Sequence, residues 1–310
     1  MAYKLDRKAL PEDEFKRVGL HQLHTAVAEI DDPRLPRDIV IHQVRKRCKK
    51  IRALTRLYRK PLGNKTYRAF NAHYRDLAAP LSGGRDAQAM LDAYDDLMEA
   101  FAGKVDRRRF SAVRRQLTLH KQALQKEAAD PKTLLADARA SLQTGGKAIE
   151  DVRFAAKYTQ APEATAAKGL KATYTRARTA MAKALESGHG EDFHEWRKHA
   201  KYHWYQCRLL RDYWPEAIRP RTKAADELGE LLGKEHDLFV LTSLLDQPDA
   251  HVCPAAVREE LDALIAARRR SIRKQATLLG GALFLQKPGP ALERIRNDAA
   301  FEAALQLGDA

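Results

Sequence analysis

Residues 42–49 read HQVRKRCK and residues 194–201 read HEWRKHAK, so one pattern, H-x-x-R-K-x-x-K, occurs twice in the chain. An arginine follows each histidine at the same offset, as Arg56 (56 − 42 = 14) and as Arg208 (208 − 194 = 14). Residues three and four positions apart share one face of an α-helix. The two stretches therefore predict two equivalent helices, each with a basic stripe.

The similarity between the two halves extends beyond these helices. An aspartate follows each histidine at nearly the same distance, as Asp86 (86 − 42 = 44) and as Asp237 (237 − 194 = 43). Landmarks in the same order and at similar spacing indicate an internal repeat. We expect two pseudo-symmetric bundles of four to five helices each around a basic central groove. Their expected boundaries are 1–150 and 151–310, and together they form one domain.

Helix signals run through the whole chain, and no stretch shows the alternation typical of a strand. Proline and acidic residues open several helices, and glycine or proline closes them. Glycine pairs are expected to end two helices, at Gly145–Gly146 and just before Gly280. The sequence predicts an all-α fold. The expected helices are 11–30, 36–59, 65–79, 85–102, 106–128, 131–144, 163–187, 192–213, 221–245, 254–279 and 290–307.

The charge balance indicates a polyanionic partner. The chain of 310 residues has 56 Lys and Arg against 41 Asp and Glu, a net charge of +15. Such an excess attracts nucleic acid, an anionic membrane surface or polyphosphate, and net charge alone does not choose among them. The hydrophobic content of 44% is enough for a packed core, so the chain is not a disordered basic tail.

The first stripe is dense in positive charge. Residues 42–60 contain no acid, and six of the eight residues 45–52 are Lys or Arg. Charge at this density repels itself and costs stability unless an anion is near. The stripe consists of His42, Arg45, Lys49, Arg52 and Arg56, at spacings of 3, 4, 3 and 4, beside an apolar stripe that suits packing.

The second helix repeats the stripe with one change, because Trp204 stands where Arg52 would be. Two basic helices beside apolar faces suggest two walls of one groove. Arg holds phosphate oxygens in fork geometry and Lys as a mobile point charge. Since the rise is about 1.5 Å per residue, one stripe contacts many successive phosphates of a linear chain.

The twin patterns, with the segments that end in Arg85-Asp86 and His236-Asp237, resemble the CHAD family, the conserved histidine α-helical domain, over about residues 10–280. The resemblance implies a two-fold pseudo-symmetric helical bundle. It also implies binding of inorganic polyphosphate in a basic central groove, and association with polyphosphate granules. His236 departs from the family pattern, in which an arginine is usual, and suggests a pH-dependent contact.

The candidate polyphosphate-binding residues combine both stripes with basic residues of other helices. They are His42, Arg45, Lys46, Lys49, Arg52, Arg56, Arg85, Arg114, Lys171, Arg178, His194, Arg197, Lys198, Lys201, Arg208 and Arg273.

Neither a catalytic site nor a cofactor or metal site is expected. The chain has no phosphate-binding loop of the G-x-x-x-x-G-K-[ST] type and no acidic cluster that suits Mg²⁺. His194 and His199 lie five positions apart and do not share a face, so a zinc site there is not expected. Three scattered cysteines argue against a disulfide framework. With no signal peptide and no apolar run of membrane-spanning length, we expect a cytoplasmic protein.

Three functions compete for the basic surface. The leading hypothesis is non-enzymatic binding of inorganic polyphosphate. A nucleic-acid-binding protein would show a similar phosphate affinity, although its bases would need aromatic platforms, and the stripes hold few aromatics besides Trp204. An enzyme acting on phosphates would need acids for a metal beside the basic residues. The sequence does not determine the oligomeric state.

Overall fold

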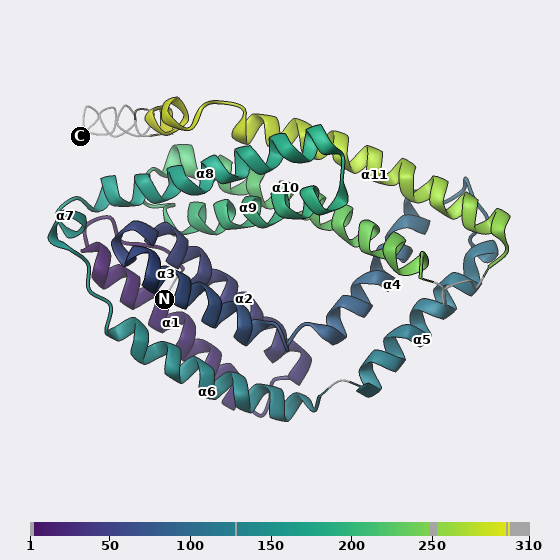
Figure 1. Cartoon of the computed structure of the whole chain (residues 1–310), viewed down its shortest axis with the longest axis horizontal. Helices are drawn as coiled ribbons and strands as arrows, with labels where there is room; N and C mark the ends of the chain where they lie inside the picture. The colour runs from purple at the N-terminus through teal and green to yellow at the C-terminus, as the bar shows by residue number, and fades with distance from the viewer. Residues whose placement is uncertain (1–2, 128, 248–252, 296, 298–310) are drawn as a thin grey trace.

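The computed structural model describes residues 3–127, 129–247, 253–295 and 297, leaving out the side chains of residues 83–86. Every regular element in these ranges is a helix, which confirms the all-α fold (Figure 1). The helices are α1 (Pro11–Asp31), α2 (Arg37–Leu57), α3 (Arg59–Ala78), α4 (Gly83–Ala100), η1 (Arg107–Phe110), α5 (Ser111–Glu127), α6 (Pro131–Glu150), α7 (Ala156–Thr159), α8 (Pro162–Ser187), α9 (Gly190–Leu209), α10 (Pro215–Leu245) and α11 (Ala255–Phe284). Residues 288–295 are helical as well.

Two expected helix ends were wrong, and both involve glycine. Helix α6 continues through Gly145 to Glu150, and α11 continues through Gly280 to Phe284. A Cβ on Gly145 would lie 2.5 Å from the Tyr74 hydroxyl oxygen, and one on Gly280 would lie 2.3 Å from a ring carbon of Trp196. These glycines permit close packing of helices rather than a break.

Helix α3 begins earlier than expected. The segment around Pro61 was expected to be a break, but a helical turn starts at Arg59 and the chain bends at Gly63. Gly63 has φ of +74°, in the left-handed region that favours glycine. The kink turns the chain so that α3 returns along α2.

The two halves share their hydrophobic cores. One core joins α1, α2, α3 and α6 to the start of α8 and the end of α9, and a second lies among α8, α9, α10 and α11. A third core packs α4 and α5 against the ends of α10 and α11, at the right of Figure 1. The hairpin of α4 and α5 thus leaves its own half and packs on the other. The division at residue 150 and the pseudo-symmetry stay predictions.

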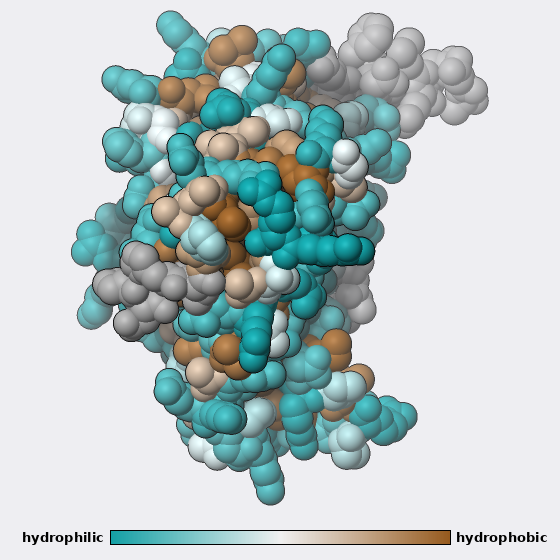
Figure 2. Space-filling view, turned by 90° about the vertical axis from the view of Figure 1, so that its right-hand side faces the viewer, coloured by the Kyte–Doolittle hydropathy of each residue, from teal (hydrophilic) through white to brown (hydrophobic). Residues whose placement is uncertain are grey.

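The face of the molecule at the right of Figure 1 is mainly hydrophilic. Figure 2 looks onto the end of the molecule at the right of Figure 1 and shows polar side chains with scattered apolar patches between them. None of the helices in the described ranges has the length and apolar character needed to cross a membrane.

Candidate polyanion-binding site

Helix α2 presents the first basic stripe as the spacing predicts. Its apolar positions, among them Val44, Cys48 and Ile51, are fully buried. The stripe residues His42, Arg45, Arg52 and Arg56 are half-buried and Lys49 is exposed. The buried face fixes the rotation of the helix about its axis, and this rotation turns the basic stripe outward.

Helix α9 presents the second stripe in the same way. Phe193, Trp196 and Ala200 are buried, whereas His194 and Arg197 are half-buried. The stripe is completed by Lys201 and Arg208, both half-buried, and Lys198 is exposed beside it.

The two helices cross near residue 53 of α2. The Gln206 side-chain amide donates to the carbonyl oxygen of Ala53 at 3.3 Å. Three residues further along α2, the Arg56 guanidinium lies 3.7 Å from the ring centroid of Tyr202. From the first of these contacts to the second, the residue number rises on α2 and falls on α9, so the two helices run antiparallel. Their stripes meet at the crossing.

The crossing is crowded with positive charge. Burial lowers the pKa of Lys50 to about 8, and the charges of Arg47 and Arg208 add to this effect. Burial also lowers the pKa of Arg56, and the charges of Arg52 and Arg176 lower it further. A bound anion would relieve this repulsion, because an opposite charge favours the charged forms.

Neutral side chains hold the first stripe in place. The Asn71 side-chain carbonyl oxygen on α3 accepts hydrogen bonds from Arg52 Nε at 3.1 Å and from Arg56 Nη1 at 2.7 Å. Because the amide carries no charge, it orients both guanidinium groups without neutralising them. These contacts with Asn71 therefore leave the charges of Arg52 and Arg56 available to a ligand.

Acidic side chains neutralise part of the second stripe. Lys201 Nζ lies 2.7 Å from Glu230 Oε1 and 3.4 Å from Asp226 Oδ1, both on α10. Lys198 Nζ lies 2.5 Å from Glu195 Oε2. All three carboxylates are exposed by four tenths or more, so these ion pairs are weak and open to exchange with a stronger anion.

Two glycines of α10 make room for this stripe. A Cβ on Gly229 would lie 2.6 Å from Lys201 Cε, and one on Gly233 would lie 3.3 Å from Arg197 Nε. The glycines are one helical turn apart, as are the two basic residues they face. Their missing side chains therefore form a shallow channel on α10 in which Arg197 and Lys201 lie.

His194 and His236 form a stacked pair beside Arg197. Their ring centroids are 3.9 Å apart at an interplanar angle of 34°. The Nδ1 atoms of both rings and Nε of Arg197 are buried without a hydrogen-bond partner. Burial lowers the pKa of both imidazoles and the neighbouring positive charges contribute to the same shift, which takes the pKa of His236 to about 4. Both rings are therefore neutral at pH 7 in the free protein.

Other predicted residues lie away from the two stripes. Arg114 on α5 pairs with Asp95 at 2.9 Å. Arg178 on α8 faces the end of α11, where its Nε donates to the Leu285 carbonyl oxygen at 3.4 Å. Lys171, on the same helix, is exposed. The Arg85 side chain lies outside the described residues.

Arg273 has a structural role in this arrangement. Its guanidinium donates to Oε1 of the buried Glu235 at 2.6 Å and to the Gly188 carbonyl oxygen at 2.9 Å. Arg269 donates to the same carboxylate oxygen at 2.7 Å. Arg273 thus joins α11 to α10 and to the turn before α9, and Glu235 neutralises part of its charge.

Sequence reasoning missed three residues at the crossing: Lys50, Arg176 and Tyr202. Arg176 follows Gly169 by one heptad on α8, and Gly169 packs so closely on α2 that a Cβ would lie 2.1 Å from the Leu57 carbonyl oxygen. The seven-residue spacing between Gly169 and Arg176, which places both on one face of α8, was the signal that the sequence offered. Tyr202 gave no such signal, since a tyrosine at a helix interface usually belongs to the core.

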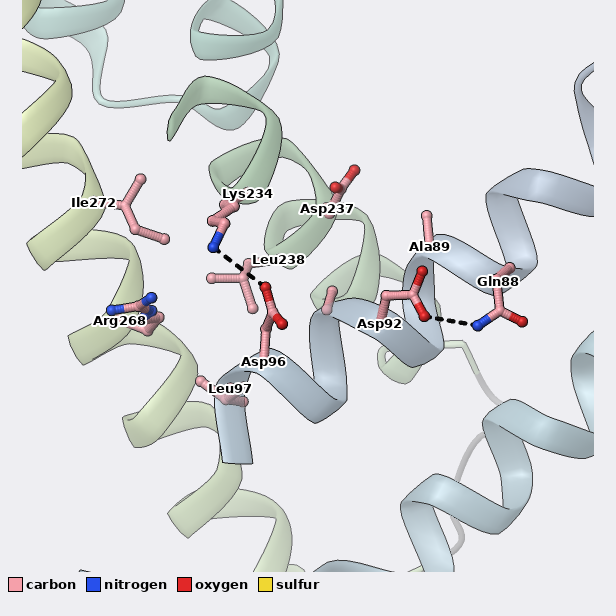
Figure 3. A pocket seen from close by; sticks show the side chains of 11 residues that line it. Gln88, Ala89, Asp92, Asp96, Leu97, Lys234, Asp237, Leu238, Arg268 and Ile272 are labelled. Carbon is pink, nitrogen blue, oxygen red and sulfur yellow. Dashed lines mark hydrogen bonds and ion pairs between the residues drawn. The ribbon is translucent and has the colours of Figure 1, made fainter. Parts of the chain in front are cut away.

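A pocket of about 230 Å³ lies apart from the stripes, among α4, α10 and α11 (Figure 3). Its polar lining has more acidic than basic residues, since Lys234 and Arg268 lie among three aspartates. Asp96 pairs with Lys234 at 3.4 Å, and Asp92 accepts a hydrogen bond from Gln88 at 2.7 Å. Carboxylates here disfavour a phosphate ligand. Among the residues described, no group of three or more His, Cys, Asp or Glu side chains is arranged to hold a metal ion.

The fold and the two stripes place the chain in a class of all-α proteins built on a pair of histidine- and arginine-bearing helices. The CHAD domain matches residues 20–246, and the chain belongs to the CHAD family. The solved structure of PptA from Streptomyces chartreusis is similar, with a TM-score of 0.61 and 15% identity over 90% of this chain and 100% of that chain. At this identity the similarity shows a shared fold. No curated protein matches the sequence.

Proposed function

We propose that this chain binds inorganic polyphosphate, without catalysis, along a continuous basic surface made by the stripes of α2 and α9. The observation that carries the proposal is the antiparallel crossing near Ala53 and Gln206, which brings two equivalent basic helices together. Membership of the CHAD family supports the same ligand. On this basis we also propose a cytoplasmic location at polyphosphate granules.

The crossing makes two short stripes into a longer one. Each stripe spans fourteen residues, which at 1.5 Å per residue is about 21 Å. Because the helices run antiparallel, a chain that follows α2 from His42 reaches Arg56 at the crossing and continues along α9 toward His194. A flexible linear polyanion with closely spaced charges suits this path.

The aromatic residues at the crossing favour polyphosphate over nucleic acid. The Tyr202 ring is covered by Arg56 at 3.7 Å, and the Trp204 ring has Lys201 at 4.7 Å and Arg208 at 4.8 Å from its centroid. A base that stacked on either ring would have to compete with these cations, and base stacking on aromatic rings is a general contact of proteins that bind single strands. Polyphosphate has no bases and needs no such platform.

The charges around the stripes support binding rather than hydrolysis. Phosphate hydrolysis by a metal enzyme needs carboxylates that hold the metal. The carboxylates nearest the second stripe, Glu195, Asp226 and Glu230, each lie against one of its lysines. We therefore expect no turnover of polyphosphate and no cofactor.

Calorimetric titration with long-chain polyphosphate tests the proposal, with duplex DNA as the comparator. The variants are wild type and Arg45→Glu/Arg197→Glu, at two salt concentrations. We expect wild type to prefer polyphosphate, with affinity that falls about tenfold or more as salt rises, because counterions are released on binding. The double variant should lose this binding.

A matched control changes the same net charge elsewhere. Lys132→Glu/Lys274→Glu alters two exposed lysines on α6 and α11, away from both stripes, and should bind like wild type. Equal or tighter binding of DNA would favour the nucleic-acid function. Equal binding by the two double variants would show that overall charge, and not the stripes, attracts the ligand.

A further inference from the structure

A second basic cavity lies at the start of α5, at the right-hand end of Figure 1 and far from the crossing of α2 and α9. Its volume is about 530 Å³. Four arginines line it, from the turn η1 and the first turns of α5. The lining residues are Tyr94, Asp106, Arg107, Arg108, Ser111, Arg114, Arg115 and Thr118.

One carboxylate on α4 holds two of these arginines side by side. Asp95 accepts hydrogen bonds from Arg114 Nε at 3.0 Å and Arg114 Nη2 at 2.9 Å, and it also accepts one from Arg107. The hydrogen bond from Arg114 holds the pKa of Asp95 below its usual range. Asp95 therefore stays ionised and fixes both guanidinium groups at the cavity wall.

The other two arginines carry charge that no carboxylate of the described residues neutralises. No carboxylate in the described part of the chain forms an ion pair with Arg108 or Arg115. Asp106 accepts from the backbone N–H of Arg108 at 3.0 Å. Four guanidinium groups thus face two carboxylates, Asp95 and Asp106, and residues 107–126 contain no acid. Such an excess of charge in one cavity is stabilised by a bound anion.

The chemistry of the lining selects the kind of anion. Guanidinium forks bind phosphoryl oxygens through paired hydrogen bonds, and the Ser111 hydroxyl is a further donor at the same wall. Tyr94 offers no face to a base, since it is fully buried and its hydroxyl donates to the Phe110 carbonyl oxygen at 3.0 Å. The lining thus suits a run of phosphoryl groups without an attached base.

We propose that this cavity is a second anion site, which binds a short inorganic oligophosphate or the end of a polyphosphate chain. Arg114 serves this site rather than the surface made by α2 and α9. The identity of the ligand as polyphosphate rests on the proposed function, but the site itself does not. With two separate sites, one protein molecule can hold two chains, or two parts of one chain, and cross-link polyphosphate by multivalency.

Calorimetric titration of the full chain with tripolyphosphate tests the site, because this ligand is too short to bridge the two places. Wild type should bind one molecule in the cavity in addition to those bound along α2 and α9. Arg108→Glu/Arg115→Glu should retain the site on α2 and α9, and Arg45→Glu/Arg197→Glu should retain the cavity. Lys104→Glu/Lys126→Glu changes the same charge on exposed residues outside the lining of the cavity, and should bind like wild type. Circular dichroism confirms that each variant is folded.

Each outcome decides a different point. The wild-type number of bound molecules in Arg108→Glu/Arg115→Glu would overturn the second site, as would a folded Arg45→Glu/Arg197→Glu protein that binds no tripolyphosphate. Failure of wild type to bind long chains would instead overturn the proposed function.

A second titration uses ATP. If ATP bound the cavity more tightly than tripolyphosphate, the ligand would be a nucleotide and not an inorganic oligophosphate. Light scattering with long chains should show cross-linking by wild type, and its persistence without the cavity arginines would overturn the cross-linking role.

Discussion

At the scale of the residue, the stacked imidazoles of His194 and His236 combine burial with positive neighbours. Arg197 and Lys198 on α9 face the pair, and Glu195 and Glu235 are the nearby acids. Burial is the largest cause of the lowered pKa of both rings. The pair is therefore a neutral hydrogen-bonding group at pH 7 that a bound anion can convert into a charged one.

This pair predicts pH-dependent binding. A phosphate beside the rings raises the pKa of His236 from its free value of about 4, so the complex takes up protons as the pH falls. Linkage then makes binding tighter at pH 5.5 than at pH 7.5, by roughly three- to tenfold. His236→Arg, which matches the arginine of the first half, should remove most of this difference. Dissociation constants of both proteins at the two pH values provide the test, and a wild-type affinity that does not change would contradict it.

His203 on α9 affects stability rather than binding. It is fully buried between the rings of Tyr174 and Phe284, and burial lowers its pKa to about 3. The unfolded chain binds a proton near pH 6.5, whereas the folded chain does not until near pH 3. Stability is therefore complete above pH 6.5 and is lost as the pH falls toward 3.

The loss amounts to about 2 kcal/mol between pH 7 and pH 5 for this one group. His203→Phe keeps the shape of the ring and removes the proton site, so its free energy of unfolding should fall less over this range. Denaturant unfolding at the two pH values measures the difference. Equal losses in wild type and variant would show that other groups control acid unfolding.

At the scale of the element, Gly229 and Gly233 of α10 leave space for basic side chains of α9. Gly229→Ala raises helix propensity by up to about 1 kcal/mol, but its Cβ would meet the Lys201 side chain. We expect unchanged or higher thermal stability together with polyphosphate affinity about tenfold weaker, the size of one lost charge-assisted hydrogen bond. Gly281→Ala is the control, since a Cβ there meets no atom within 4 Å. Wild-type affinity in Gly229→Ala would show that the position of Lys201 does not matter.

The spacing of basic residues in the sequence predicted the two basic helices but not the elements that pack around them. The stripes of α2 and α9 follow from periodicity, because burial of one face fixes the direction of the other. Glycine was ambiguous, since Gly63 bends the chain whereas Gly145 and Gly280 serve close helix packing. The local sequence does not distinguish these uses, because the difference lies in the helix packed against each glycine.

At the scale of the whole molecule, the packing of distant helices determines where each predicted basic residue lies, and the sequence does not reveal this packing. The hairpin of α4 and α5 packs on α10 and α11 of the other half, so Arg114 lies at the far end of the molecule and not beside the first stripe. Arg273 was also predicted to bind the ligand, and it contacts the buried Glu235; its contact with a ligand stays a prediction. A basic residue on a helix face is equally compatible with a ligand or with a buried acid until the partner helix is known.

The central claim is that α2 and α9 form one continuous site, and calorimetry tests it with a polyphosphate chain of defined length that covers both stripes. Wild type, Arg45→Glu and Arg197→Glu are compared in the Arg108→Glu/Arg115→Glu background, so that the cavity at α5 does not contribute. A continuous site predicts that each single change raises the dissociation constant by about tenfold or more. The stoichiometry should stay the same. Unchanged affinity with half the binding sites in each variant would contradict the claim and show that the two stripes bind separately.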